Sequence, residues 1–265
     1  MAILFVEEVF SLLSKTTKIC SGMWTIYPKE LSSFFSSLIG YVVIAVFLLI
    51  MGLTMWVFPD TGILDSSYAS MEPLFSLAPL ILLFIIPAVT MRSFSEEIQS
   101  GTLEILITKP ITETQIVLGK FLACVSLSAI TLIPTLLYYY SVYQLGSPPG
   151  NLDSGAVAGS YIGLVFLASS FTAVGIFGSA LSKNQIVSFL FSVLLCFLFY
   201  YGFYFLSKLP LFFGKSDDIV AMIGMDYHYN ALSKGNVDSR NVIYFLSLIA
   251  FFLYLTIHWI KNRIF

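Results

Sequence analysis

The sequence predicts an all-α membrane protein built around six transmembrane helices. Hydrophobic residues make up 58% of the chain and charged residues only 11%, whereas soluble proteins are about one quarter charged. The apolar residues are also grouped into long runs. A helix that rises about 1.5 Å per residue needs about 20 residues to cross about 30 Å of hydrocarbon, and the runs approach or exceed that length. The six runs are 38–58, 74–91, 121–143, 156–181, 185–206 and 241–259.

Residues 1–22 lack a clean pattern and form an N-terminal extension ahead of a single domain at 23–265. The start does not resemble a cleaved signal peptide, because it lacks a basic region and because Glu7 and Glu8 interrupt its apolar stretch. Met23 directly precedes the first regular helix, so a mis-assigned start with Met23 as the initiator is an alternative interpretation.

An amphipathic helix is predicted just before the first span. Large apolar residues recur there at helical spacing, and Lys29, Glu30 and Ser33 lie on the other side. Pro28 suits a position in the first turn. Such a helix favours the membrane interface, which buries one side and leaves the other in water. The apolar residues are Trp24, Tyr27, Leu31, Phe34, Phe35 and Leu38.

The distribution of lysine and arginine predicts that both termini are cytoplasmic. Residues 182–184 (SKN) separate the fourth and fifth runs, which as one helix would be more than twice as long as the bilayer is thick; we therefore expect a tight turn there. With the N-terminus inside, most basic residues fall on the cytoplasmic side, as the positive-inside rule requires. Tyrosine-rich stretches at 138–143 and 200–205 fall at the outer ends, where aromatic rings favour the headgroup level.

A polar segment between the second and third spans is predicted to form a cytoplasmic elbow. Ser93 and Glu96 have the spacing of a capping box, which would start a short helix. Gly101 permits a sharp turn, residues 102–108 supply one or two amphipathic turns, and Pro110 ends them because it cannot donate a backbone hydrogen bond.

The spacing of Thr112 and Gln115 predicts a second capping box, which starts the helix of the third span. A solvated loop would need neither the two capping boxes nor the apolar stripe. The pattern therefore favours a docking surface for another protein.

At this segment the chain becomes similar to a known family. The stretch EEIQSGTLEILITKPI (96–111) resembles the elbow of permeases of the type-two ABC exporter superfamily. Further stretches, in order between residues 29 and 261, resemble gliding-motility permeases of the GldF type; they include NLDSGAVAGSYIGL, LSKNQIV and GMDYHYNALSKGNVDSRNVIYFLS. The N-terminal extension falls outside the resemblance.

The resemblance implies a six-helix permease half that pairs with a second permease, the same or a different chain, and with a separate ABC ATPase that receives the elbow. ATP and Mg²⁺ would be bound by that ATPase and no cofactor by this chain; membrane lipids are the other expected partners, and nucleic acid is not expected. The implied location is the inner membrane of a bacterium. The elbow residues assigned to ATPase coupling are Glu96, Glu97, Gly101, Thr102, Glu104, Thr108, Lys109 and Pro110.

Several kinds of chemistry are not supported by the sequence. The chain has no G-x-x-x-x-G-K-[ST] phosphate loop, so any ATP hydrolysis of that type needs another subunit. The six apolar runs contain no Asp, Glu, Lys or Arg, which argues against a proton- or sodium-driven carrier. The sequence DYHY at 226–229 is the nearest approach to a reactive cluster, and we interpret it as a helix cap rather than a metal or catalytic site.

Three glycines on the fourth span, Gly155, Gly159 and Gly163, are spaced four residues apart and predict close helix packing. Packing within the chain is the first interpretation and an interface with the partner permease is the second.

The segment 208–240 is too long for a simple turn and too apolar for disorder. The resemblance implies re-entrant outer helices here. We expect Ile219, Met222, Ile223 and Met225 to share one side of a short helix and to form, with Tyr227 and His228, an outer gate.

The leading hypothesis is a non-enzymatic permease subunit of the gliding-motility type that couples an ATPase to export or to mechanical work. One alternative is a related ABC exporter permease for another cargo, such as a lipid, a polysaccharide, a drug or a component of copper-site maturation. A polytopic membrane enzyme is disfavoured, because we find no polar catalytic set at membrane depth.

Overall fold

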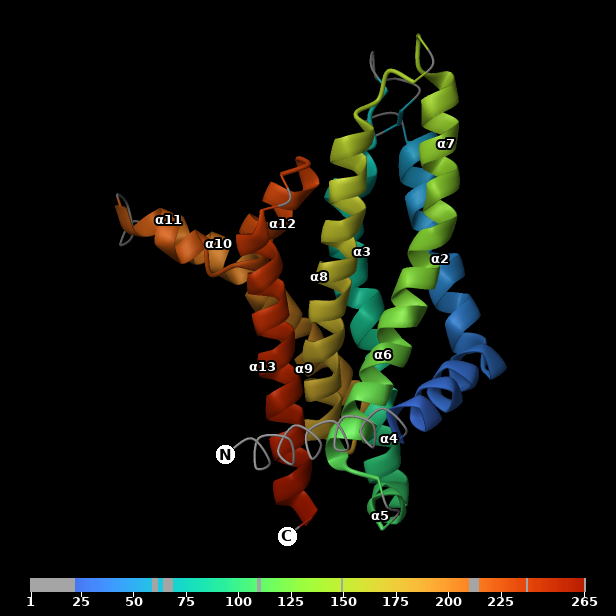
Figure 1. Cartoon of the computed structure of the whole chain (residues 1–265), viewed down its shortest axis with the longest axis vertical. Coiled ribbons are helices and arrows are strands. Elements are labelled where there is room, and N and C mark those ends of the chain that lie inside the picture. The colour runs from blue at the N-terminus through green and yellow to red at the C-terminus, as the bar shows by residue number, and fades with distance from the viewer. Residues whose placement is uncertain are drawn as a thin grey trace, which may run out of the picture.

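The computed structural model describes residues 22–58, 62–63, 69–108, 111–148, 150–209, 215–236 and 238–264, and these form helices without any strand. Six helical stretches are long and apolar enough to cross a membrane, as predicted (Figure 1). They run over Leu38–Trp56, Glu72–Ser100, Glu113–Leu145, Ser154–Leu181, Gln185–Ser207 and Ser239–Arg263.

Several of these stretches are divided into shorter helices. The second comprises α3 (Glu72–Thr90) and α4 (Arg92–Ser100), and the third comprises α6 (Glu113–Leu132), a 3₁₀ turn that contains Pro134, and α7 (Leu136–Leu145). The remaining helices are α2 (Leu38–Trp56), α5 (Thr102–Ile107), α8 (Ser154–Leu181), α9 (Gln185–Phe197), α10 (Phe203–Ser207), α11 (Lys215–Ala221), α12 (Met225–Ser233) and α13 (Ser239–Ile264). The predicted tight turn at 182–184 is confirmed, and the Asn184 side chain caps α9 by accepting a hydrogen bond from the backbone N–H of Ile186 at 2.9 Å.

The helix α8 lies at the centre of the bundle and packs against α3, α9, α12 and α13. Its many Gly, Ala and Ser residues allow these neighbours to approach closely. A side chain added at Gly175 would overlap Thr90 of α3, and one added at Gly178 would overlap Ser192 of α9. The small residues of α8 therefore set the spacing of the core.

An additional helix at residues 22–36 lies against the bundle at the end where α4 and α5 lie, which we call the elbow end (Figure 1). Phe34 is buried in a small core with residues of α3 and α6, and the Tyr27 and Ser126 hydroxyls are 3.0 Å apart. The predicted helix is confirmed, although Glu30, which was expected on its polar side, pairs with the buried Lys120. Its place at the membrane interface stays a prediction. The predicted place of Pro28 in the first turn is wrong, because the helix is already formed at residue 22.

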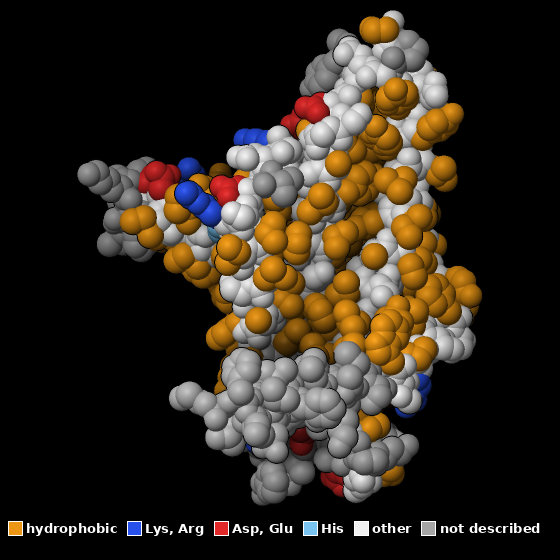
Figure 2. All heavy atoms as spheres, in the orientation of Figure 1, with side chains coloured by type: hydrophobic (Ala, Val, Ile, Leu, Met, Phe, Trp, Pro, Cys, Tyr) orange, Lys and Arg blue, Asp and Glu red, His pale blue; other side chains and the backbone are white. Residues whose placement is uncertain are grey.

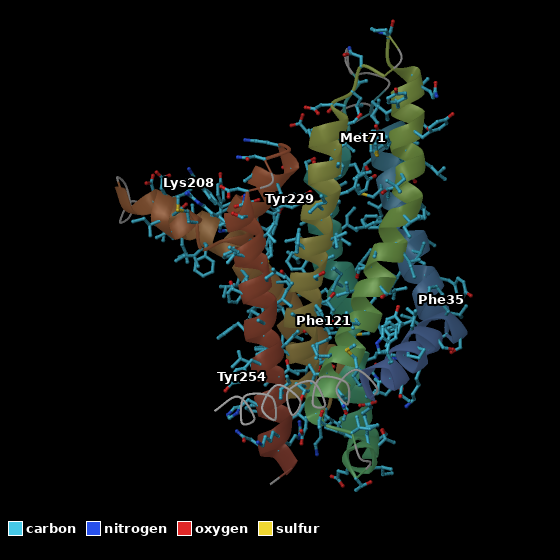
Figure 3. The ribbon with its side chains drawn as sticks, viewed as in Figure 1. Phe35, Met71, Phe121, Lys208, Tyr229 and Tyr254 are labelled. Atoms are coloured by element: carbon cyan, nitrogen blue, oxygen red, sulfur yellow. The ribbon has the colours of Figure 1, made fainter. Side chains whose placement is uncertain are left out.

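A lateral arm, formed by α10 and α11, leaves the bundle beyond the end of α9. The helix α9 passes into a π-helix at Leu198–Gly202 and then into α10, and in Figure 1 α10 and α11 run sideways from the bundle. By contrast, α12 returns to the core, where the buried Tyr229 donates a hydrogen bond to the Phe75 carbonyl at 2.7 Å (Figure 3).

The expected common face of Ile219, Met222, Ile223 and Met225 is not observed. Ile219 lies in α11, Met222 and Ile223 lie in the turn that follows, and Met225 is buried at the start of α12. Gly224 interrupts the helix and packs closely on the arm, where an added Cβ would lie 3.3 Å from Cβ of Phe203.

Candidate functional site

The elbow consists of α4, Gly101 and α5, which protrude at one end of the bundle (Figure 1). Gly101 has φ +72°, in the left-handed region that favours glycine. A Cβ added there would meet nothing within 4 Å, so the backbone conformation alone requires the glycine. The predicted sharp turn is confirmed.

The predicted capping box of Ser93 and Glu96 is wrong. Ser93 is already inside α4, and Met91 before that helix is itself helical, with its N–H donating to the Pro87 carbonyl at 2.9 Å, so Ser93 does not occupy the capping position. The second predicted box is confirmed, since Thr112 and Gln115 make both capping contacts at the start of α6.

The hydroxyl of Ser179 on α8 fixes the junction of α3 and α4. It accepts hydrogen bonds from the N–H groups of Phe94 and Ser95, at 2.9 and 3.1 Å, and donates to the Met91 carbonyl at 2.9 Å. Ser179 is fully buried and gives these backbone groups hydrogen bonds away from water. The elbow is thereby attached to the central helix.

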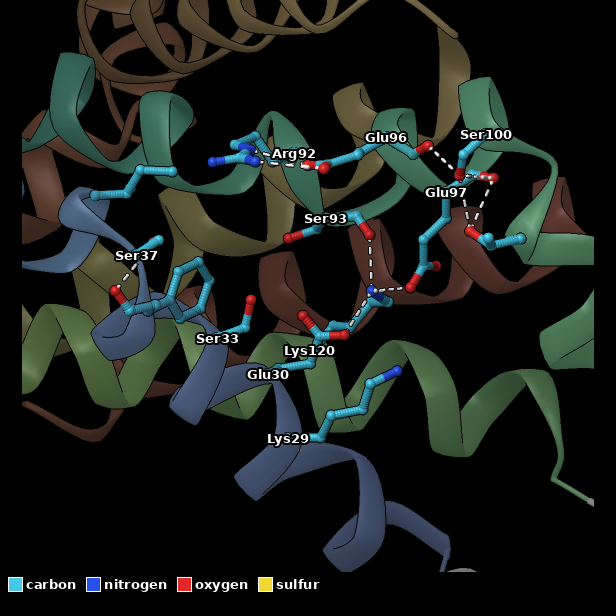
Figure 4. A pocket seen from close by; sticks show the side chains of 13 residues that line it. Lys29, Glu30, Ser33, Ser37, Arg92, Ser93, Glu96, Glu97, Ser100 and Lys120 are labelled. Carbon is cyan, nitrogen blue, oxygen red and sulfur yellow. Dashed lines mark hydrogen bonds and ion pairs between the residues drawn. The ribbon is translucent and has the colours of Figure 1, made fainter.

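A buried cluster joins the elbow to two other helices. The Lys120 ammonium on α6 lies 2.8 Å from Glu97 Oε1, 2.9 Å from Glu30 Oε1 and 2.7 Å from the Ser93 carbonyl (Figure 4). It also lies 5.2 Å from the centre of the Phe94 ring. All three ammonium hydrogens therefore have an acceptor. We call Lys120, Glu30 and Glu97 the Lys120 cluster.

The Lys120 side chain is only 2% exposed, and a lysine is almost never buried in this way unless it is paired. The sequence alone did not single out Lys120, which was only one of the basic residues expected on the cytoplasmic side. One signal was available, because Ile116, Lys120, Ala123 and Leu127 form a single helical stripe and the other three are apolar and buried.

The two glutamates of the elbow have different environments. Glu96 pairs with Arg92 at 2.9 Å on the exposed side of α4. Glu97 points inward to Lys120, and its second oxygen, Oε2, is buried without a hydrogen-bond partner in the described part of the chain. Glu96 is therefore accessible to a partner, whereas Glu97 is engaged inside the chain.

The remaining residues assigned to the elbow lie around its tip. The Thr102 and Ser100 hydroxyls are 2.9 Å apart across the Gly101 turn, and the Thr108 hydroxyl donates to the Ile105 carbonyl at 2.8 Å. Glu104 is exposed in the first turn of α5. Lys109 and Pro110 lie outside the described residues.

Two hollows flank the elbow. The inner cleft, of about 390 Å³, lies between the 22–36 helix and α4, and Lys120 forms part of its wall (Figure 4). The elbow groove, of about 420 Å³, lies between the elbow, the 182–184 turn and the end of α13. The elbow groove is lined by Glu97, Ile98, Gly101, Leu103, Glu104, Thr108, Lys183 and Arg263.

The three glycines of α8 have different surroundings. A Cβ added at Gly163 would lie 3.0 Å from Cβ of Leu232 and 3.5 Å from the Tyr229 ring, so this glycine allows α12 to pack on α8. Gly159 is buried, and Gly155 is exposed in the first turn, where its N–H donates to the capping Asp153. An interface role for these glycines stays a prediction.

The residues expected to form an outer gate lie around the turn between α11 and α12. The His228 ring is 2.8 Å from the Asn241 side chain and 2.9 Å from the Met222 carbonyl, and it stacks on Tyr244. Tyr227 is exposed. In the described residues no group of His, Cys, Asp and Glu is arranged to hold a metal ion. Closure of a path by this turn stays a prediction.

The six candidate spans and the protruding elbow define a multi-pass membrane protein. Residues 60–225 match the family described as ABC-2 family transporter protein, and the chain belongs to this family. Its members are membrane permeases of ABC transporters, which in general work with an ABC ATPase and pair as dimers. No curated protein matched the chain.

Proposed function

We propose that this chain is the permease subunit of an ATP-driven transporter and that its elbow is the surface on which a separate ATPase acts. The observation that carries this proposal is the Lys120 cluster, because it ties the elbow to the helices that it would have to move.

Force applied to the elbow has two routes into the bundle. The first is direct, because α4 continues the helical path of α3 and Ser179 attaches their junction to α8. The second passes through Lys120, which connects α4 to α6 and to the 22–36 helix. Buried ion pairs of this kind break only at a high energetic cost, so the connected helices would move together.

The tip of the elbow has the properties of a docking surface. Ile105 is 64% exposed and lies beside Glu104 in α5. Lys183 and Arg263 provide positive charge across the elbow groove. An exposed apolar anchor surrounded by charges of both signs is typical of a specific protein interface. We therefore assign Glu104 and Ile105 to ATPase contact and Glu97 to internal support.

Charge reversal tests this assignment. When the full chain carries Glu104→Lys and Ile105→Asp, at least about tenfold less ABC ATPase should co-purify with it than with the wild-type chain. A loss of this size is expected when a hot-spot contact is removed. Glu72→Lys is the matched control, because Glu72 is also an exposed acid in a first helical turn but lies at the opposite end of the bundle. Undiminished recovery with the double variant would refute the assignment.

We further propose that the elbow faces the cytoplasm and that the chain works in a bacterial inner membrane, in a complex of the gliding-motility type. The described chain starts and ends at the elbow end, in agreement with both termini on one side (Figure 1). ATP-dependent flux in reconstituted vesicles would distinguish export from purely mechanical work. An exporter for another cargo is the alternative.

A further inference from the structure

Another cavity, lined mostly by polar residues, lies away from the elbow, between the lateral arm and α12. Its volume is about 390 Å³, within the range of about 300–1,000 Å³ that is usual for small-ligand sites. It is lined by Tyr204, Ser207, Lys208, Asp217, Asp218, Ala221, Gly224, Asp226, Tyr227, Asn230, Ala231 and Lys234. We call it the arm cavity.

Charges of both signs face the arm cavity without neutralising each other. Lys208 and Lys234 supply positive charge, and Asp217, Asp218 and Asp226 supply negative charge. In the described part of the chain none of these five side chains takes part in an ion pair. A ligand that carries both a cation and an anion would pair with both groups at once.

Two of the charged groups are held in place by neighbours. The Lys208 ammonium lies 5.5 Å from the centre of the Tyr204 ring, in a cation–π contact, and Lys208 lies on the lateral arm (Figure 3). Burial raises the pKa of the Asp226 carboxyl group, and the neighbouring Tyr200 and Asn230 side chains counteract part of that rise. A fixed cation and a fixed carboxylate reduce the ordering cost of binding.

The surroundings of the arm cavity favour a lipid over a free solute. Near it, Leu209, Ile219, Met222 and Ile223 expose large apolar side chains. Figure 2 shows charged side chains gathered on the arm with hydrophobic side chains beside them. A helical arm that runs sideways from the bundle and carries both charged and large apolar side chains suits the membrane interface.

We propose that the arm cavity binds the headgroup of an aminophospholipid, with the phosphate on Lys208 and Lys234 and the primary ammonium on the aspartates. Lysine is a common phosphate ligand. The carboxylates and the ring of Tyr227 suit an ammonium group. This site does not depend on the ATPase assignment of the elbow.

Native mass spectrometry of the full-length chain in detergent, with added phosphatidylethanolamine or phosphatidylglycerol, tests the proposal. The wild-type chain should retain phosphatidylethanolamine preferentially. Lys208→Ala with Lys234→Ala should weaken binding of both lipids by at least about tenfold, the equivalent of one lost charge-assisted hydrogen bond. Asp217→Asn, Asp218→Asn and Asp226→Asn together should abolish the preference and leave phosphatidylglycerol bound.

Arg240→Ala is the matched control, because the Arg240 side chain is 89% exposed and lies outside the cavity lining. It should bind both lipids as the wild type does, and a monodisperse gel-filtration peak establishes that each variant is folded. Unchanged binding by the lysine variant would overturn the proposal, as would a loss of equal size with Arg240→Ala. Soluble glycerophosphoethanolamine should bind more weakly than the lipid, and equal binding would overturn the assignment to a lipid.

Discussion

The Lys120 ammonium lies 2.8 Å from the Glu97 carboxylate, although the two residues belong to different helices on opposite sides of the Gly101 turn. The contact ties the elbow to α6. Because Glu30 takes part in the same cluster, the 22–36 helix is joined to the elbow and to α6 as well. The elbow is therefore connected to the adjoining ends of α3 and α6 by both the chain and the Lys120 cluster.

Replacement of Lys120 by methionine should lower the free energy of unfolding by up to about 3–5 kcal/mol, because Glu30 and Glu97 would be left mostly shielded from water and without their countercharge. Chemical unfolding of the full chain in detergent measures this change. A triple variant with Lys120→Met, Glu30→Gln and Glu97→Gln should recover much of the loss. Wild-type stability of the single variant would show that the cluster does not hold the elbow.

Ser179→Ala should destabilise the chain by about 1–3 kcal/mol, because the N–H groups of Phe94 and Ser95 would lose their buried acceptor. Ser188→Ala is a close control. Ser188 is equally buried, but its hydroxyl has no hydrogen-bond partner among the described residues, so its loss should be nearly neutral. Equal effects of the two substitutions on the unfolding midpoint would contradict the assigned role of Ser179.

Gly101→Val should cost about 1–2 kcal/mol, because a β-branched residue disfavours the left-handed conformation. Gly101→Asn should cost less, since asparagine adopts this conformation more readily and an added Cβ meets no neighbour within 4 Å. The thermal unfolding midpoints of the two variants show which substitution destabilises the chain more. A larger loss for asparagine than for valine would count against a purely conformational requirement.

Cysteine labelling tests the predicted topology. In a background without native cysteines, Asn151→Cys and Asp217→Cys should react with an impermeant maleimide in intact cells, and Lys109→Cys only after permeabilisation. The reason is the excess of basic residues at the elbow end. Labelling of position 109 in intact cells would place the elbow outside and overturn the orientation.

Local sequence signals predicted the spans, the turn at 182–184, the Gly101 turn and the Thr112–Gln115 capping box. Each depends on residues within a few positions of one another. The Lys120–Glu30 contact joins residues 90 positions apart and the Ser179–Phe94 contact joins residues 85 apart, so no local spacing reports them. The break at Gly224 also depends on tertiary packing, because the close neighbour is Phe203 on the arm.

Photo-cross-linking from the tip of the elbow tests the central claim most directly. A benzophenone amino acid would replace Ile105, which is 64% exposed, or Glu72 at the opposite end of the bundle, in cells that contain the assembled complex. A covalent adduct with the ABC ATPase is expected from position 105 and none from position 72. No ATPase adduct from position 105, or an equal yield from both positions, would contradict the claim that the elbow receives the ATPase.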